Sequence, residues 1–243
     1  MTWSTNLPVP ARALAIGAHP DDVEFNCGAT FAKWSAAGCV VNHLILTDGS
    51  KGSWDPDQDL EALVAVRQDE QRAAARALGS TGEVAFGGWV DGELEADLGR
   101  RERVAWWIRH FRPDVVLAHD PWKRYRIHPD HRAAGFLACD GIVAARDPHF
   151  HPEHDVDPWR PSTLLLFEAD EPDHVEDVTD WMEPKLDALE RHESQFETTM
   201  FKDLGEVESE REAFRQRERD EMATAAVSTG FRYAETFRLV TDL

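Results

Sequence analysis

The sequence predicts an α/β fold in which a mostly parallel sheet is flanked by helices. Short apolar runs of strand length alternate along the chain with longer segments whose apolar residues recur at helical spacing. Polar residues with useful chemistry follow two of these apolar runs, as is typical at the carboxyl ends of strands in open α/β sheets. The 243 residues suit one large domain, and we expect a single domain over residues 1–243.

The expected elements follow in order from the N-terminus. Strands are predicted at residues 12–17, 39–46, 83–86, 114–118, 162–167 and 235–240. Helices are predicted at residues 26–37, 60–78, 100–111, 132–146, 182–196 and 204–226. Gly38 and Gly79 close the first two helices, because glycine is favoured just past a helix end. The last helix carries interspersed acidic and basic residues, which are typical of a solvated face, so we assign no chemistry to it.

The charge of the chain limits its partners. A net charge of −20 predicts high solubility and argues against nucleic acid or an anionic membrane as a partner, because each needs a concentrated basic face. Lys123, Arg124 and Arg126 form a local basic patch that is the exception. We therefore expect a small-molecule partner, with a homo-oligomer left open.

The cellular compartment is predicted from the kinds of segment that the sequence does not contain. No apolar run approaches membrane-spanning length, and no charged segment precedes an apolar one at the N-terminus. The three cysteines show no metal-type spacing, which indicates small apolar filling in a reducing environment. We expect a cytoplasmic protein.

The first polar corner follows the apolar run at residues 13–16 and reads His19-Pro20-Asp21-Asp22. Pro20 suits the first position of a helix, because its fixed φ and missing N–H are tolerated there. Asp21 and Asp22 would then occupy the first helical turn, where free N–H groups and the helix dipole favour carboxylates. The corner therefore presents one imidazole and two carboxylates at the end of a strand.

A second corner of the same kind, His128-Pro129-Asp130-His131, precedes the predicted helix at residues 132–146. Two such corners at one rim of a sheet could bring three imidazoles and three carboxylates together. Histidine and carboxylate ligands suit zinc or a similar divalent ion, and three protein ligands leave a position open for water. His19 and Asp22 can converge on one ion, whereas the spacing does not decide between His128 and His131 as the third ligand. Taken singly, each of these residues is more often a helix cap than a ligand.

Three further histidines lie in the turn-rich stretch at residues 147–155. They are His149, His151 and His154. We interpret the stretch as a solvated loop and not as a second metal site, because no predicted strand or helix fixes the relative positions of the three imidazoles.

Six short motifs carry a resemblance to a known family. They are Ala18-His19-Pro20-Asp21-Asp22, Thr47-Asp48-Gly49, Arg67 and Glu70 with Leu78-Gly79, His128-Pro129-Asp130-His131, His192-Glu193-Ser194-Gln195 and Ala234-Glu235-Thr236-Phe237. Each motif alone is weak, but in this order the chain resembles the PIG-L or LmbE-like zinc-dependent N-deacetylases. The resemblance covers most of the chain and implies a Rossmann-like α/β fold.

The resemblance also implies roles for the corner residues. The residues that match the family's zinc ligands are His19, Asp22 and His131. Another divalent metal such as Fe²⁺ is an alternative to zinc. Asp21 is implied as the general base and His128 as the group that stabilises the tetrahedral intermediate, while Asp130 could hold or polarise a histidine.

The implied activity is hydrolysis of an amide. Zinc would polarise the carbonyl and lower the pKa of its bound water toward about 7, so that Asp21 can take the proton as water attacks. The substrate would be a small N-acylated amino sugar or glycoconjugate, and an amidase acting on a thiol conjugate is a variant of the same chemistry. A non-catalytic carbohydrate-binding protein is the alternative from another class. Asp21 argues against it, because a binder needs no base beside its metal ligands.

The sequence allows two interpretations for each of several residues near the predicted site. Asp48 and Gly49 either shape the floor of a pocket or form a plain turn after a strand. Arg67 either reaches the substrate or pairs within the scaffold. Asp91 and Glu93 either meet a sugar or are solvated loop carboxylates, which is the commoner case.

Other residues depart from the expected pattern or stay outside the catalytic set. His192 and Gln195 match a family motif but lie in a predicted helix, where a histidine is usually structural. Some relatives carry a tyrosine where this chain has Arg126, and Tyr125 comes one step earlier, so substrate contact by Tyr125 is not expected. Cys27 is close enough to the first corner to line the site.

Overall fold

The structure, a computed structural model, describes residues 3–201 and 204–243. Its sheet has eight strands in the order β1-β7-β8-β6-β5-β2-β3-β4. The strands are β1 (Ser4–Thr5), β2 (Arg12–Gly17), β3 (Val40–Thr47), β4 (Val84–Trp89), β5 (Val115–His119), β6 (Thr163–Phe167), β7 (His174–Asp177) and β8 (Ala234–Val240). Strand β8 runs antiparallel to β6 and β7, and the other neighbouring pairs are parallel. The predicted α/β class with a mostly parallel sheet is confirmed.

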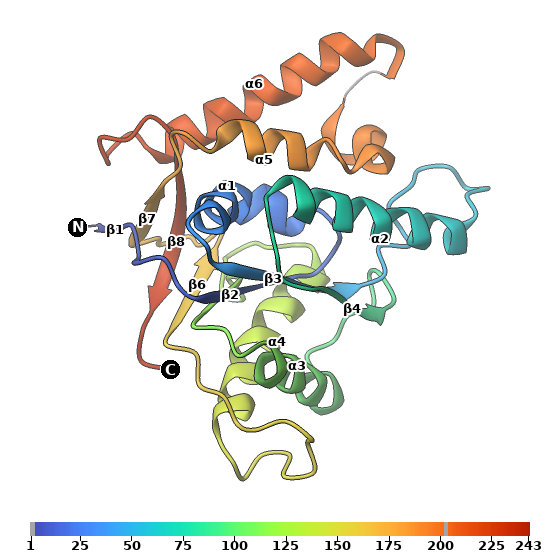
Figure 1. Ribbon diagram of the computed structural model, residues 1–243. Helices are drawn as coiled ribbons and strands as arrows, with labels where there is room; N and C mark the ends of the chain where they lie inside the picture. Colours follow the sequence, from blue (N-terminus) through green and yellow to red (C-terminus); the bar gives the residue numbers. More distant parts are fainter. Residues whose placement is uncertain (1–2, 202–203) are drawn as a thin grey trace.

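Helices cover both faces of the sheet (Figure 1). They are α1 (Asp22–Ala36), α2 (Leu60–Ala77), α3 (Leu98–Phe111), α4 (Pro129–Arg146), α5 (Met182–Leu189) and α6 (Val207–Ala225). Helices α1, α2 and α5 lie on one face, α3 and α4 lie on the other, and α6 lies outside α5. Within the described ranges, no helix is both long enough and apolar enough to cross a membrane.

The predicted boundaries differ from the structure in several places, and β4, predicted at residues 83–86, extends to Trp89. Strands β1 and β7 were not predicted, because two and four residues are too short to show a clear period. Helices α1 and α4 begin earlier than predicted, since their first turns carry the polar corners and not an apolar stripe. The predicted helix at residues 182–196 ends at Leu189 and is followed by a 3₁₀ turn (Glu193–Gln195) and a π turn (Phe196–Met200).

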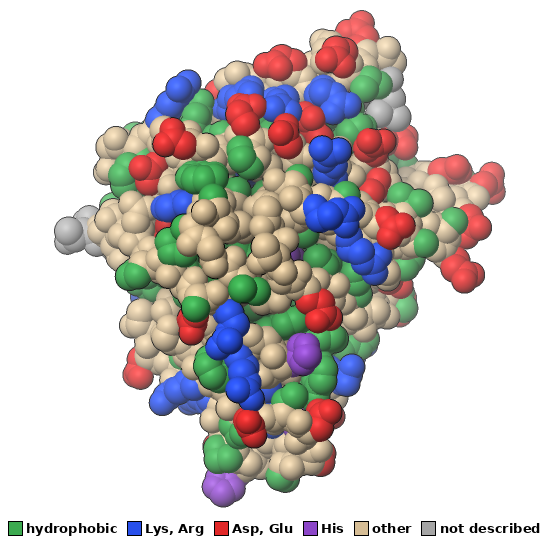
Figure 2. Space-filling view, in the orientation of Figure 1, with side chains coloured by type: hydrophobic (Ala, Val, Ile, Leu, Met, Phe, Trp, Pro, Cys, Tyr) green, Lys and Arg blue, Asp and Glu red, His purple; other side chains and the backbone are tan. Residues whose placement is uncertain are grey.

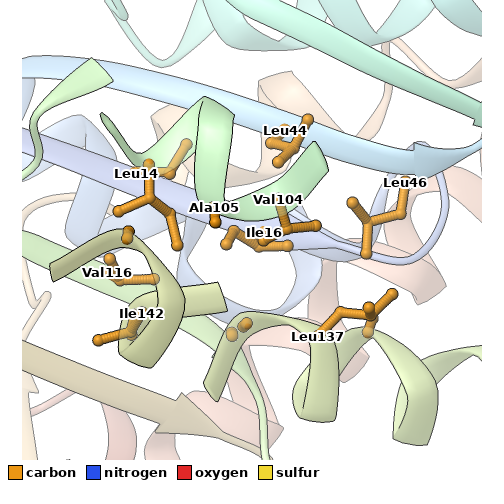
Figure 3. Close-up of a cluster of buried hydrophobic side chains, with 14 of the residues drawn as sticks. Leu14, Ile16, Leu44, Leu46, Val104, Ala105, Val116, Leu137 and Ile142 are labelled. Atoms are coloured by element: carbon orange, nitrogen blue, oxygen red, sulfur yellow. The ribbon is translucent and has the colours of Figure 1, made fainter. Parts of the chain in front are cut away.

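The core consists of two apolar layers, one on each face of the sheet. Along β2, Leu14 and Ile16 point toward α3 and α4, while Ala13 and Ala15 point toward α1. Figure 3 shows the first layer, where side chains of β2, β3 and β5 pack against those of α3 and α4. The second layer includes Phe31 of α1. Burial on both faces explains why these strands read as continuous apolar runs.

Helix α1 is broken at Cys27, whose backbone is non-helical with φ −147° and ψ 18°. The buried carboxylate of Glu235 on β8 accepts hydrogen bonds from the N–H groups of Ala29 and Thr30, which begin the second part of the helix. Lys185 of α5 donates to Glu235 and to the carbonyl of Phe25. The pair therefore satisfies the backbone groups that the break sets free. Cys27 itself is packed in the core.

Candidate metal and catalytic site

The site lies where the order of the sheet reverses. The chain passes from β2 to β3 on one side and later returns to β5 on the other side of β2. In open α/β sheets the crevice outside the carboxyl ends of two such strands is the usual ligand site. The first corner directly follows β2, and His119 ends β5. The second corner begins α4, which follows β5 in the chain.

The first corner is a tight turn in front of α1. Helix α1 begins at Asp22, and Asp21 is its N-cap in the left-handed region with φ 98°. Pro20 therefore precedes the helix and does not open it, so the predicted placement of Pro20 and Asp21 in the first turn was wrong. The reason is that the Asp22 carboxylate turns back to accept the N–H of His19 at 2.7 Å, which closes the turn. At the second corner Pro129 lies in the first turn of α4 with His128 as the N-cap, so the helix begins three residues before the predicted start at residue 132.

Donor atoms of three residues from the two corners lie close together. His131 Nε2 lies 3.2 Å from His19 Nδ1 and 3.4 Å from Asp22 Oδ1, and His19 Nδ1 lies 3.6 Å from Asp22 Oδ2. Tetrahedral ligands at about 2.0–2.1 Å from a zinc ion lie about 3.3 Å apart. This donor set therefore fits a divalent metal ion, in both its geometry and its mixture of imidazole and carboxylate ligands.

Asp130 is a buried partner of His19. Its Oδ2 lies 3.1 Å from His19 Nε2, and its two oxygens also accept the N–H groups of Gly92 and Leu94. Asp91 lies on the same side, 3.3 Å from His19 Nε2. Both carboxylates contact Nε2 of His19, so Nδ1 is the nitrogen that faces Asp22 and His131. Asp130 thus lies on the Nε2 side of His19, where its carboxylate could hold or polarise the imidazole.

His119 is a site residue that the sequence analysis missed. Its Nε2 lies 3.1 Å from Asp22 Oδ2, and its ring stacks on His131 with centroids 4.3 Å apart. Its Nδ1 lies 3.0 Å from Glu168, which also pairs with Arg126. His119, Asp22 and His131 form a group whose ligand atoms lie within 4.8 Å of one another, and His19, His128 and His131 form another. The signal was a histidine at the carboxyl end of a buried strand, directly after the predicted range 114–118.

The neighbouring aspartates differ in acidity. Burial raises the pKa of Asp21 to about 6, although the nearby Arg67 opposes this shift. Burial also disfavours the ionised form of Asp22, but His131 and His119 outweigh it and hold the pKa of Asp22 well below its usual value. Asp22 therefore remains an anion that suits a cation, whereas Asp21 can exchange a proton near neutral pH.

The two histidines of the second corner are neutral. Burial lowers the pKa of His131 to about 4, which suits a metal ligand because metal ions bind the unprotonated imidazole. Burial and the neighbouring His19 lower the pKa of His128. His128 lies at the mouth of the site, with its ring 4.7 Å from that of His19 and 4.7 Å from that of His131.

The site opens into a cavity of ≈ 580 Å³, which is within the usual range for small-molecule sites. At one end it is lined by His19, Asp21, Asp22, Asp91, His128 and His131. Arg67 and Gln195 also line it. Arg67 donates to the carbonyls of Gly49 and Pro20, and Gln195 donates to that of Gly52. Arg67 therefore pairs within the scaffold and also lines the cavity, while its contact with substrate stays a prediction.

The remaining candidates near the site tie loops together. Asp48 accepts the N–H groups of Ser50 and Asp91, and so joins the loops that follow β3 and β4. A side chain at Gly49 would meet the guanidinium of Arg67 at 2.8 Å. Glu93 pairs with Lys51 at the surface. His192 is buried behind the site, 3.4 Å from Glu24.

The predicted basic patch is paired with carboxylates. Lys123 and Arg126 contact Glu168, and Arg124 contacts Asp170. The side chain of Arg126 is only 5% exposed and points at the framework of the site. Tyr125 is 94% exposed, and its expected lack of substrate contact stays a prediction.

The loop at residues 147–155 is better ordered than predicted. Buried Arg109 of α3 donates to the carbonyls of Ala144, Ala145, Asp147, Phe150 and His151. It also donates to Nδ1 of His154. His154 is held neutral by burial and by Arg109, so its proton lies on Nε2, which faces Glu102 at 3.5 Å. Ligand atoms of Glu102, His151, Glu153 and His154 lie within 4.8 Å of one another, and the interpretation of this loop as one without a second metal site stays a prediction.

Comparison with known proteins gives the family. The family described as PIG-L: GlcNAc-PI de-N-acetylase matches residues 14–141, a range that holds both corners. The chain belongs to the PIG-L family. A curated PIG-L relative, the diacetylchitobiose deacetylase of Thermococcus kodakarensis, is 36% identical over 190 residues, which cover 76% of this chain and 70% of the relative. The 1D-myo-inositol 2-acetamido-2-deoxy-alpha-D-glucopyranoside deacetylase of Streptomyces avermitilis is 32% identical over 173 residues, which cover 61% of this chain and 58% of the relative.

Solved structures agree with the PIG-L assignment. The N,N'-diacetylchitobiose deacetylase of Pyrococcus horikoshii superposes with a TM-score of 0.85 at 31% identity and covers 96% of this chain and 84% of its own. The 4-carboxy-2-hydroxymuconate hydratase GalB of Pseudomonas putida superposes with a TM-score of 0.73 at 22% identity, which shows a shared fold alone. The PIG-L family and the two curated relatives are N-deacetylases, that is, amide hydrolases.

Proposed function

We propose that this chain is a metal-dependent N-deacetylase that removes an acetyl group from a small molecule containing an amino sugar. The observation that carries the proposal is the convergence of His19 Nδ1, Asp22 and His131 Nε2 beside the proton-accepting Asp21. The relatives that act on acetylated amino sugars support the substrate class.

Zinc is the metal that we assign to the site, with Fe²⁺ as the alternative. His19, Asp22 and His131 would hold it, and Asp130 would keep the proton of His19 away from the ligand nitrogen. Bound there, zinc supplies Lewis acidity toward the amide carbonyl and lowers the pKa of a bound water to about 7.

The proton transfers belong to the chain's own residues. Asp21, with its pKa raised to about 6, accepts a proton from the attacking water and holds it between steps. Neutral His128 lies beside the ligand histidines and donates an N–H to the oxygen that gains negative charge. The leaving amine then takes the proton that Asp21 holds, and acetate and the free amine are released.

The direct test combines metal analysis with an assay of amine release from N,N'-diacetylchitobiose. We expect near-stoichiometric zinc in the purified protein, release of amine, loss of release after chelation and recovery on adding zinc. Release that is insensitive to chelation would contradict the metal site. Absence of release from any acetylated amino sugar would favour the carbohydrate-binding alternative, whereas release from a thiol conjugate alone would favour the amidase.

A further inference from the structure

The cavity extends well beyond the residues of the catalytic end. The cavity is also lined by Phe25 and Asn26 of α1, by Thr198 and Thr199, and by Glu218 and Glu221 of α6. The last two residues are three positions apart and so share one face of α6. A substrate whose acetamide lies beside Asp21 can therefore reach α6 with its remaining part.

Helix α6 has a charged outer surface and a different inner face. Acidic and basic side chains are interspersed over α5 and α6 at the top of Figure 2, as the sequence predicted for a solvated helix. Arg215 and Arg219, for example, pair with carboxylates of α5. Glu218 is turned inward and is only 7% exposed, so the prediction that α6 carries no chemistry holds for its outer surface alone.

The charged side chains at the catalytic end of the cavity already have partners within the protein. Arg67 is bonded to the backbone of both neighbouring loops, and Lys51 is bonded to Asp91 and Glu93. Glu168 pairs with Arg126. These groups therefore offer little free charge to a ligand.

Glu218 and Glu221 differ from these groups. Across residues 3–201 and 204–243, neither carboxylate has a hydrogen bond or an ion pair. The cations nearest to Glu218 are committed elsewhere, since Lys185 donates to Glu235 and Arg217 donates to the carbonyl of Met200. Glu218 is 7% exposed and has only the longer-range attraction of Lys185 and Arg217, and burial raises its pKa, whereas Glu221 is an exposed residue that lines the same cavity. A cation that enters the cavity would supply the missing partner.

We propose that Glu218 and Glu221 form a subsite for a primary ammonium group, so that the preferred substrate is an amino-sugar conjugate with a free amine beside its acetamide. An ammonium group has three donors, and two carboxylates on one helix face can accept them in strong charge-assisted hydrogen bonds. This proposal rests on the proposed deacetylase function, because the subsite would bind a part of the same substrate that is not hydrolysed. An oligosaccharide of amino sugars that has lost only some of its acetyl groups has this chemistry.

Turnover provides the first test. We compare N,N'-diacetylchitobiose, which is neutral, with its monoacetylated form, which carries one free amine. The wild type should prefer the monoacetylated dimer in kcat/KM, and Glu218→Gln and Glu221→Gln should each reduce that preference about 10-fold. Glu208→Gln, which removes one charge from the exposed surface of α6, should leave the preference intact. Added salt should weaken the preference of the wild type for the monoacetylated dimer.

Binding provides a second test that does not depend on turnover. Calorimetry with the fully deacetylated dimer should show tighter binding than with cellobiose, and Glu218→Gln and Glu221→Gln should remove the difference while Glu208→Gln keeps it. Equal binding of the two dimers by the wild type, or an unchanged difference in both variants, would overturn the subsite. If calorimetry shows the subsite but no dimer loses acetate, the proposed function fails and the subsite stands. Glu221→Gln keeps the test open if Glu218→Gln does not fold.

Discussion

Arg67 and Gln71, one turn apart on α2, hydrogen-bond the two ends of the same peptide group. Arg67 donates to the carbonyl of Pro20 at 2.7 Å, and the side-chain oxygen of Gln71 accepts the N–H of Asp21 at 3.0 Å. The amide of Gln71 is itself oriented by Glu24, which accepts its N–H at 2.7 Å. This clamp holds Asp21 at φ 98°, a conformation that non-glycine residues seldom adopt without support.

The clamp predicts that Gln71 positions the proposed base. In Gln71→Met the N–H of Asp21 loses its acceptor, so we expect kcat to fall about 10- to 100-fold because a small displacement of a reacting group is costly. Zinc content should be unchanged, since Gln71 contacts none of the proposed ligands. Gln68→Met on the same helix, which removes only a contact with Arg72, is the matched control. Equal kcat in both variants would show that the clamp is not needed.

The two adjacent aspartates should separate metal binding from proton transfer. Asp21→Asn should keep its zinc and lose about 10²- to 10⁴-fold in kcat, because the proton acceptor is removed. Asp22→Asn should lose zinc affinity, because its anionic ligand is replaced by a neutral amide. Zinc analysis and kcat on the same samples check both. Normal zinc in Asp22→Asn, or normal turnover in Asp21→Asn, would reverse the assignment.

His119 should support the metal through Asp22. In His119→Asn the Asp22 carboxylate loses the partner at 3.1 Å, and His131 loses the ring stacked upon it. Partners of this kind are worth about 10- to 100-fold in metal affinity. We expect zinc to dissociate more readily in competition with a chelator, with kcat largely restored by excess zinc. If excess zinc restores nothing, His119 has a role in the reaction itself.

Local patterns predicted the scaffold and the two corners, whereas contacts between distant segments escaped prediction. The apolar runs predicted β2, β5 and β6 because these strands are buried on both faces. The corners could be placed at one rim because parallel strands end at the same edge of a sheet. The turn at Pro20 was misplaced because its geometry depends on the clamp from α2, 47 residues away in the chain.

The missed residues share this dependence on tertiary contacts. His119 becomes a site residue only because β5 pairs with β2, which brings it to Asp22. Glu218 looks like its charged neighbours in sequence, and only the packing of α6 turns it toward the cavity. No periodic pattern distinguishes these residues, because their partners lie in other elements.

A buried ion pair away from the site should control acid stability. Glu176 accepts hydrogen bonds from Lys33 at 2.8 Å and from the N–H of Leu7 at 2.7 Å. Burial disfavours its charge, but His174 and Lys33 outweigh burial and lower the pKa of Glu176. The unfolded chain, with a pKa of about 4.3, therefore binds more protons than the folded chain. The stabilisation is complete above about pH 5 and is lost as pH falls through the lowered pKa of the folded state.

Urea unfolding of Glu176→Gln from pH 7 to pH 3.5 measures this effect. At pH 7 we expect a loss of about 3 kcal/mol, because Lys33 is left without its buried anion. The difference from the wild type should shrink as the pH falls, since the wild-type carboxylate becomes protonated. Glu61→Gln, an exposed carboxylate of α2, should follow the wild type at every pH. A difference that stays constant with pH would show that the loss is one of packing and not of charge.

Arg109 should determine the order of the loop at residues 147–155. Its guanidinium donates to five carbonyls of the segment at residues 144–151, so Arg109→Met would leave these acceptors without their buried donor. We expect a loss of about 3 kcal/mol or more in unfolding free energy and faster cleavage at Glu153 by a glutamate-specific protease. Arg103→Met, an exposed change on the same helix, should alter neither.

Arg109→Lys retains the charge without the branched donors and should show intermediate cleavage, because the loop depends on several hydrogen bonds made at once. Wild-type cleavage in Arg109→Met would mean that the loop is ordered by its own turns.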